Sequence, residues 1–398
     1  MPRTTIRAED ITDSQVGSAE IATGAVDSAE IATNAVTATE IAATTITPAQ
    51  MASSAFLANR NIFINGAMLV SQRNTSVAAV TTNGYYTVDR MRLSTSSMGT
   101  WTIAQETLTS GNAFADGFQK AFRMDCTTAN ASPAAANNLA VQCKMEGYTL
   151  QGLKKGTANA KSFTVSFWVK SNLTGNYNFF VKDRDNSRQA IQLYTISAAD
   201  TWEKKTITFT GDTTGVLGCD ANSSLEFWWM LGSGTDYSSG TRPTGWEAGA
   251  VWANTGVGNV NLASSTDNDW AITGVQFEIG DTATPFEHRR YGAELWECQR
   301  YYQRVKENWW AYCTAAAVID CFVQLTPDMR AAPSVTLDDT TPTVQKVNVA
   351  NYTGSSSAIT ASSLNTTRGF VRMNGFSGLA SNSDYLLVST PFYFDAEL

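Results

Sequence analysis

Large aromatic side chains gather between residues 228 and 270, in a stretch that is otherwise rich in Gly, Ser and Thr. The members of this cluster are Trp228, Trp229, Tyr237, Trp246, Trp252 and Trp270. A flat aromatic face stacks against the apolar face of a sugar ring, and neighbouring polar side chains bond the hydroxyl groups of the sugar. The residue types in this stretch are therefore suited to binding carbohydrate.

Not every member of the cluster is free to meet a ligand. In the predicted strand 224–234, successive side chains point to opposite faces, so one of Trp228 and Trp229 must face the core. The loop aromatics and the polar residues beside them are the better candidates for sugar contact, namely Tyr237, Trp246, Trp252, Asp236 and Arg242. A subunit interface and ordinary loop packing are the alternative interpretations of the same residues.

Catalytic chemistry has little support in the sequence. A Ser-His-Asp triad would have to use His288, the single histidine, and no G-x-S-x-G motif is present. A glycosidase needs two carboxylates, and the candidates carry no individual signal; they include Asp183, Asp185, Glu226 and Asp236. A packed or ion-paired histidine is the favoured interpretation of His288, and we expect a protein that is not an enzyme.

No metal or cofactor site is predicted. The cysteines at positions 126, 143, 219, 298, 313 and 321 form no C-x-x-C pair, so a zinc site is not expected. Residues 183–187 have the alternating oxygen ligands of a calcium loop but are not followed by its glycine or its closing acid. No nucleotide or flavin motif occurs. The six cysteines are expected to be reduced and mostly buried thiols.

The overall composition argues against two classes of partner. A formal net charge of −8 and a pI near 4.9 disfavour binding to a nucleic-acid backbone, which requires Lys and Arg patches. No apolar run approaches the roughly 18 residues of a membrane span, so no membrane insertion is expected. The first ten residues lack the apolar region of a signal peptide, so none is expected.

Short strands separated by turns dominate the middle of the chain. The candidate strands cover residues 61–69, 84–94, 163–171, 176–183, 202–211, 224–234 and 270–280. Their lengths, and the clean alternation of apolar and polar residues in 163–171, predict a two-sheet jelly roll. An amphipathic helix is expected over 292–305. Further short strands predict a small C-terminal β-domain over 305–398.

Residues 1–57 repeat with a period of ten that splits into two fives. An apolar residue recurs at every fifth position, and the central members of this row are Ile11, Val16, Ile21, Val26, Ile31, Val36, Ile41 and Ile46. One aliphatic side chain per five residues cannot stabilise a single chain, so several copies must bury the row along a common axis. Cap-forming residues three positions before Glu or Gln predict a short helix and a turn in each repeat. An elongated homotrimeric helix–turn shaft is the favoured interpretation, and a disordered linker is the alternative.

Three separated segments resemble parts of phage virion fibre proteins. The first is NRNIFINGAMLVSQRNTS with GYYTVDRMRL, the second runs from SFTVSFWVKSN to KKTITFTGD, and the third is ITGVQFEIGDTATPFEHRRYGAELWECQRYYQR. They occur in the expected order across residues 60–304, where the family has a jelly-roll module similar to carbohydrate-binding modules. The repeats in 1–57 also resemble helix–turn shafts in fibres of short-tailed phages. In 305–398 only FYFDAEL is similar.

Sequence pattern and resemblance together predict a mainly β protein in three parts. These are an N-terminal shaft and anchor over 1–57, a jelly-roll module over 58–304 and a C-terminal β cap over 305–398. The resemblance implies a homotrimer that attaches to other virion proteins through its N-terminus and binds host cell-surface polysaccharide. A tail fibre is favoured, a capsid-decorating head fibre is the alternative, and a polysaccharide depolymerase is the second alternative. The expected location is the phage particle surface, after synthesis in the host cytoplasm.

Overall fold

The computed structural model describes residues 59–249, 251–306, 308–337, 342–346, 350–353, 358–388 and 391–398. All of these belong to one compact unit, Leu57–Leu398. The predicted shaft over 1–57 lies outside the described residues, and so do the positions from Ile11 to Ile46 that were assigned to its axis. Its trimeric helix–turn structure stays a prediction.

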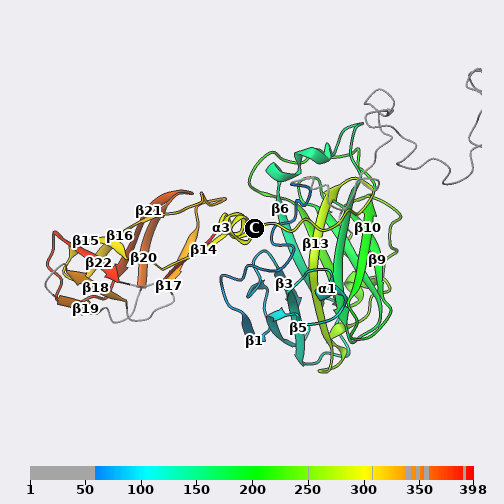
Figure 1. Ribbon diagram of the computed structural model, residues 1–398, viewed down its shortest axis with the longest axis horizontal. Helices are drawn as coiled ribbons and strands as arrows, with labels where there is room; N and C mark the ends of the chain where they lie inside the picture. Colours follow the sequence, from blue (N-terminus) through cyan, green and yellow to red (C-terminus); the bar gives the residue numbers. More distant parts are fainter. Residues whose placement is uncertain are drawn as a thin grey trace, which may run out of the picture. The chain divides into compact units, whose positions relative to one another are not determined.

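The described part of the chain is mainly β. Its larger part, which contains β1 to β13, is a jelly roll of two antiparallel sheets (Figure 1). The first sheet has six strands in the order β1 (Ser76–Val80), β4 (Thr100–Thr107), β5 (Lys120–Thr128), β13 (Asp269–Ile279), β7 (Phe163–Ser171) and β10 (Glu203–Phe209). The second has seven in the order β12 (Glu247–Ala248), β9 (Arg188–Ile196), β8 (Gly175–Asp183), β11 (Ser223–Ser233), β6 (Asn138–Glu146), β3 (Arg92–Ser96) and β2 (Gly84–Tyr85). The predicted jelly roll is confirmed.

One hydrophobic core fills the space between these two sheets. The predicted alternation in β7 is confirmed, because its odd-numbered apolar residues from Phe163 to Val169 all belong to this core. From the facing sheet, Trp229 contributes a fully buried ring whose centroid lies 5.8 Å from that of Phe167. Apolar side chains from both inner faces interdigitate, as in other two-sheet sandwiches. The next residue, Trp228, points away from this core, as strand geometry requires.

Short helices connect the strands of the jelly roll. They are α1 (Asn112–Ala115), η2 (Gly147–Leu153), α2 (Thr235–Ser238), η3 (Trp252–Asn254) and η4 (Leu262–Ser264). Among the described residues, no helix is both long enough and apolar enough to cross a membrane. All six cysteines are free thiols, and only Cys219 is exposed, so the expectation of reduced and mostly buried thiols is confirmed.

The predicted strand over 61–69 is wrong, because this segment forms a turn. Asn65 and Met68 adopt positive φ values of 61° and 57°, which a strand does not allow. The Asn65 amide donates to the backbone oxygens of Val70 and Asp89 at 2.9 and 3.1 Å, and its Oδ1 accepts from the Val70 backbone N–H at 2.9 Å. Side-chain hydrogen bonds therefore take the place of a strand ladder.

Two other predicted elements have different boundaries in the structure. The strand expected over 84–94 is divided into β2 and β3 by a turn in which Arg90 has a φ of 71°. The helix expected over 292–305 ends early, as α3 (Tyr291–Gln299), and is followed by β14 (Tyr302–Val305). Residues 302–305 pair instead with residues 392–395 near the C-terminus, and this pairing overrides the helical pattern of the sequence.

The C-terminal part folds as two further antiparallel sheets. A three-stranded sheet has the order β14, β23 (Phe392–Asp395) and β17 (Ser334–Leu337). A seven-stranded sheet has the order β19 (Ala350–Thr353), β18 (Thr343–Lys346), β22 (Ser383–Val388), β15 (Trp309–Ala315), β16 (Val318–Gln324), β21 (Arg368–Asn374) and β20 (Ala358–Leu364). These sheets enclose a separate hydrophobic core that includes Trp309, Leu387 and Phe392.

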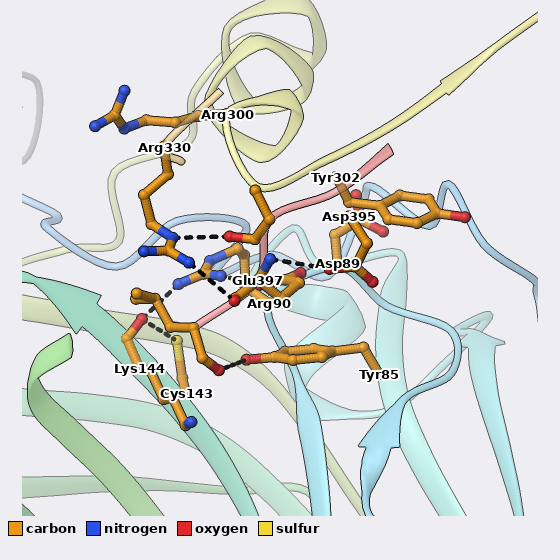
Figure 2. A network of polar contacts seen from close by, with 12 residues as sticks. Tyr85, Asp89, Arg90, Cys143, Lys144, Arg300, Tyr302, Arg330, Asp395 and Glu397 are labelled. Carbon is orange, nitrogen blue, oxygen red and sulfur yellow. Dashed lines mark hydrogen bonds and ion pairs between the residues drawn. The ribbon is translucent and has the colours of Figure 1, made fainter. Parts of the chain in front are cut away.

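A buried polar network fixes the residues that follow β23 against the jelly roll (Figure 2). The Glu397 carboxylate forms an ion pair with Arg90, and both side chains are almost fully buried. The Tyr85 hydroxyl donates to the Leu398 carbonyl at 3.2 Å, and the Arg330 Nε donates to the Ala396 carbonyl at 2.7 Å. Breaking such a pair leaves an uncompensated charge in a low-dielectric site, so the network holds this end of the chain in place.

Candidate functional site

The seven-stranded sheet of the jelly roll has one face that points away from the main core, and we call it the outer face. Its central side chains are Arg92, Ala140, Gln142, Lys144, Asn178, Phe180, Lys182, Gln189, Ile191, Glu226, Trp228 and Met230. Strand pairing places Glu226 directly between Lys182 on β8 and Lys144 on β6. In the next row, Trp228 lies between Phe180 and Gln142. The outer face therefore consists of a charged row beside an aromatic one.

The aromatic row is packed against side chains from the segment that contains α2 and η3, and we call this segment, residues 235–256, the crossing segment. The Trp228 ring stacks on Phe180 with centroids 5.4 Å apart and planes 15° apart. From the crossing segment, Trp252 meets Trp228 edge-on at 5.7 Å, and Tyr237 meets Trp252 at 6.0 Å. Trp252 remains 38% exposed, whereas Trp228 is buried. Of the three rings, Trp252 thus presents a large open surface next to the sheet.

Backbone contacts hold the crossing segment in a fixed shape. The Gly256 N–H donates to the Tyr237 carbonyl at 2.8 Å, and the Gly240 N–H donates to the Ala253 carbonyl at 2.9 Å. A Cβ added to Gly240 would lie 2.0 Å from the Asn254 side chain, so this close approach needs glycine. These contacts join α2 to η3 and fix the position of Trp252.

The charged row contains more cations than carboxylates. Glu226 accepts a hydrogen bond from Trp228 Nε1 at 3.1 Å, and its other oxygen lies 3.9 Å from Lys144 Nζ and 3.6 Å from Arg184 Nε. Lys182 is its opposite neighbour on β8. One carboxylate thus serves several positive groups, in a chain whose net charge is −8.

Lys182 is the least compensated of these cations. Its side chain is buried, with the residue only 5% exposed, and its Nζ lies 3.7 Å from the centroid of the Trp252 ring. Within the described part of the chain, no hydrogen bond or ion pair within 4.0 Å joins the Lys182 ammonium to another side chain. Burial, followed by repulsion from Arg184, lowers its pKa from 10.5 to about 8. An aromatic ring stabilises this ammonium but cannot accept its hydrogen bonds as an anion would.

Buried acceptors on the same face also lack partners. Gln142 Oε1, Gln189 Oε1 and Asn178 Oδ1 have no hydrogen-bond donor among the described residues. An unsatisfied buried acceptor is costly, and a donor such as a hydroxyl group would recover part of that cost.

The five residues predicted to bind sugar do not lie together. Tyr237 and Trp252 meet at the outer face, and the Tyr237 hydroxyl accepts a hydrogen bond from Asn138 Nδ2 at 2.9 Å. Trp246 lies apart from them: its Nε1 donates to the Thr210 carbonyl at 2.9 Å, and its ring packs against the main core. Asp236 is exposed in α2, while Arg242 is half-buried in the loop that follows.

Sequence reasoning missed the cations of this face. Lys182 and Lys144 alternate with core residues in β8 and β6, so strand parity alone could have assigned each to an outward position. Their position on either side of Glu226 depends on the pairing of β8 and β6 with β11, and these strands are separated by long connections. No local signal in the sequence gives that pairing.

His288, the sole candidate for a catalytic histidine, lies elsewhere. Its ring centroid is 4.9 Å from that of Phe286 and 5.2 Å from that of Phe118. Burial lowers its pKa, and the nearby Asp116 partly opposes this effect. These contacts fit the packed histidine that the sequence favoured.

Comparison with known proteins gives structural likenesses only. No family model matches the chain, and no curated protein matches its sequence. The enzymatically active domain of tailspike protein 4 of bacteriophage CBA120 is similar over 55% of this chain and 21% of that chain, with 10% identity and a TM-score of 0.28. This chain therefore matches about a fifth of that tailspike.

Sugar-binding proteins are similar to the same degree. A putative sugar binding protein from Bacteroides thetaiotaomicron is matched over its whole length and 55% of this chain, with 12% identity and a TM-score of 0.29. The N-terminal CBM22-1–CBM22-2 tandem domain of Paenibacillus barcinonensis Xyn10C is matched over 98% of its length and 82% of this chain, with 10% identity and a TM-score of 0.23. At these TM-scores the likenesses do not bear on function, which rests on the residues described above.

Proposed function

We propose that this chain binds glycans through the outer face, with Trp252 as the aromatic contact. The observation that carries the proposal is the position of Trp252, which is 38% exposed beside a row of charged side chains. A sugar ring can stack on the exposed indole while its polar groups meet the neighbouring charged residues. Tyr237 and Trp228 hold the indole in place from its edges.

The biological setting that we propose is the virion of a tailed phage. The support is the resemblance of three segments across 60–304 to phage fibre proteins, together with the repeat in 1–57. In this proposal the chain is a homotrimer that attaches to other virion proteins through residues 1–57 and presents the jelly roll to host polysaccharide. A tail fibre is our first assignment and a head fibre is the alternative.

The same proposal makes the chain a binder and not an enzyme. The outer face presents the aromatic ring of Trp252, several cations and one central carboxylate, that of Glu226. A glycosidase uses two carboxylates, and Glu226 is already in contact with Trp228, Lys144 and Arg184. A weak site is sufficient in a trimer, because linking sites raises avidity roughly 10²–10⁴-fold over a single site. Polysaccharide depolymerase activity is the alternative, and release of oligosaccharides from host polysaccharide would favour it.

A pair of tryptophan substitutions tests glycan binding. Trp252→Ala is expected to lower binding of the full-length protein to host cells and to a glycan array by at least tenfold. The matched control is Trp296→Ala in α3, which removes an indole that is 54% exposed and lies on a helix outside the sheets. Equal binding by wild type and Trp252→Ala, with both folded by circular dichroism, would show that the outer face is not the site.

The virion assignment has tests of its own. Light scattering on the purified full-length chain is expected to give a trimer, and a stable monomer would contradict it. Cryo-electron microscopy of the phage particle would locate the fibre on the tail or on the head. A protein found on neither would overturn the virion proposal without affecting the glycan site.

A further inference from the structure

We infer that the outer face selects sugars that carry a negative charge, and that Lys182 binds that charge. This inference rests on the proposed function, because it concerns the same site, and it goes further by assigning the chemical class of the ligand. The shared chemistry is an anionic group on a sugar ring, which a uronic acid or a sugar phosphate would supply.

The first argument is the local charge balance. Lys144, Lys182 and Arg184 surround Glu226, so three positive groups face one carboxylate, and Arg92 adds a fourth positive charge in the next row of the same face. The rest of the protein is acidic, since the chain carries 28 Lys and Arg against 36 Asp and Glu. A positive patch on an acidic protein attracts anionic ligands and disfavours other acidic surfaces.

A second carboxylate, that of Glu247, contacts Gln189, the neighbour of Lys182 on β9, but has no ion pair with the cations of this patch among the described residues. Glu247 in β12 accepts hydrogen bonds from Gln189 Nε2 at 2.6 Å and from Asn254 Nδ2 at 2.9 Å. It therefore supports the crossing segment and not the cations. Lys182 and Arg92 have no carboxylate within ion-pair distance among the described residues.

The second argument is the state of Lys182 itself. Taking an ammonium out of water is costly unless hydrogen bonds or an opposite charge compensate it. Lys182 is 5% exposed and has the Trp252 ring as its partner at 3.7 Å. A ligand anion would supply the charge-assisted hydrogen bonds that the protein itself does not provide.

The third argument is the position of Lys182 relative to the sugar contact. The indole on which a sugar ring would stack is the one that lies against the lysine ammonium. Lys182 covers one side of the indole, so an acidic substituent that extends from the stacked sugar past the edge of the ring would meet the ammonium. A neutral sugar would stack on the same indole but leave the ammonium uncompensated.

The test compares matched oligosaccharides on the full-length protein. One probe is an oligosaccharide of alternating glucose and glucuronic acid, the second is its carboxyl-reduced form, and the third carries mannose 6-phosphate. Wild type is expected to bind the acidic probe at least tenfold tighter than the reduced one. Comparison of the first and third probes shows whether carboxylate or phosphate is preferred.

Three variants isolate the charge of Lys182. Lys182→Met keeps the aliphatic stem against Trp252 and is expected to abolish the preference for the acidic probe, while binding of the reduced probe is unchanged. Lys182→Arg is expected to retain the preference. Lys204→Met removes the positive charge of an exposed residue in β10 of the opposite sheet and is expected to have no effect.

The outcomes separate this inference from the proposed function. Equal affinity of wild type for the acidic and reduced probes, with binding still lost in Trp252→Ala, would overturn the charge preference and leave glycan binding intact. An acidic preference that persists in Lys182→Met would overturn the role of Lys182. Failure of every probe to bind, together with unchanged cell binding by Trp252→Ala, would overturn both.

Discussion

The described part of this chain contains two seven-stranded antiparallel sheets, one in the jelly roll and one in the C-terminal part. Each sheet has one face that points away from its hydrophobic core, and the side chains on these two faces differ. On the jelly roll, the aromatic row is covered by the crossing segment and the cations are left without enough carboxylates. On the C-terminal sheet, aromatic side chains are bare: Trp310, Tyr312, Phe322 and Phe370 are between 39% and 54% exposed.

The charges on the C-terminal sheet are also arranged differently. Asp320 accepts two hydrogen bonds from Arg372, at 2.7 and 2.6 Å, so this pair compensates itself. Phe322 lies directly opposite Phe370 on the neighbouring strand. The comparison teaches that exposed aromatics alone do not distinguish a glycan site. The distinguishing feature of the outer face is an exposed ring beside a cation that is buried and lacks a counter-charge, whereas Arg368 on the C-terminal sheet is exposed to water.

The largest expected effect is the difference in free energy of unfolding between replacing a buried tryptophan and replacing an exposed one. Trp229→Ala empties a fully buried site between the jelly-roll sheets and should reduce the free energy of unfolding by about 3–5 kcal/mol. Trp310→Ala, on the exposed face of the C-terminal sheet, should change it by about 0.5 kcal/mol or less. Urea unfolding followed by tryptophan fluorescence measures both, and similar values would contradict the assignment of the two cores.

A second prediction contrasts a buried ion pair with an exposed one. Glu397→Gln leaves the Arg90 guanidinium buried without its counter-charge and should cost about 3 kcal/mol. Arg372→Gln breaks the pair on the C-terminal sheet, where water solvates the remaining Asp320, and should leave the unfolding midpoint almost unchanged. Differential scanning calorimetry compares the two variants. A larger loss in Arg372→Gln would reverse our view of which pair matters.

A third prediction separates two tryptophans that sequence reasoning grouped together. Trp246→Ala should lower the free energy of unfolding by about 1–2 kcal/mol, because the ring packs against the main core and donates to the Thr210 carbonyl. It should leave glycan binding intact. Trp310→Ala should also leave binding intact, because Arg368, the cation on its face without a carboxylate partner among the described residues, is exposed and solvated by water. Loss of array binding in either variant would place the site elsewhere.

The smallest expected effect is a pH dependence of stability. The folded-state pKa of Lys182 is lowered to about 8, so between pH 8 and the ordinary lysine pKa of 10.5 the unfolded chain binds a proton that the folded chain has released. The contribution of Lys182 to stability therefore rises with pH across this window. The groups that face it are Glu226, which opposes the shift, Arg184, which adds to it, and, farther off, Lys144 and Glu247.

Comparison with Lys182→Met isolates this contribution. At pH 7.5 the wild type carries the cost of a buried ammonium and Lys182→Met does not. The melting temperature of the wild type relative to that of Lys182→Met should therefore be higher at pH 9.5 than at pH 7.5. A difference that is the same at both pH values would show that Lys182 titrates in its ordinary range.

Local pattern predicted the sandwich but not its exceptions. Alternation in 163–171 predicted the core face of β7, because a strand with one buried face must have period two. The apolar residues of 61–69 predict a strand that the structure does not contain. The turn in this segment is imposed by hydrogen bonds from the Asn65 side chain to Val70 and Asp89, and amide side chains at these positions gave no distinct signal.

The candidate site was predicted only in part. The sequence indicates Tyr237 and Trp252 because they lie in Gly-rich loops and not in a strand that must turn side chains to the core, and the structure places them together. Trp246 has the same sequence context but fills a gap beside the main core. The contribution of Lys182 depends on which strands pair across the sheet, and such long-range register is not encoded in any short window.

The buried pair of Arg90 and Glu397 has a mechanical consequence. The chain leaves the jelly roll through β14 and returns through β23, and these strands pair side by side, with Tyr302 opposite Asp395 and Val305 opposite Phe392. Because the returning end is held by Arg90, a force that pulls the C-terminal sheets away acts on two strands together and not on one covalent linker. The two strands share the load, and separation of the C-terminal sheets from the jelly roll has to break the buried ion pair as well as the strand contacts. In the virion fibre that we propose, this double attachment would resist tearing when the bound cell surface moves.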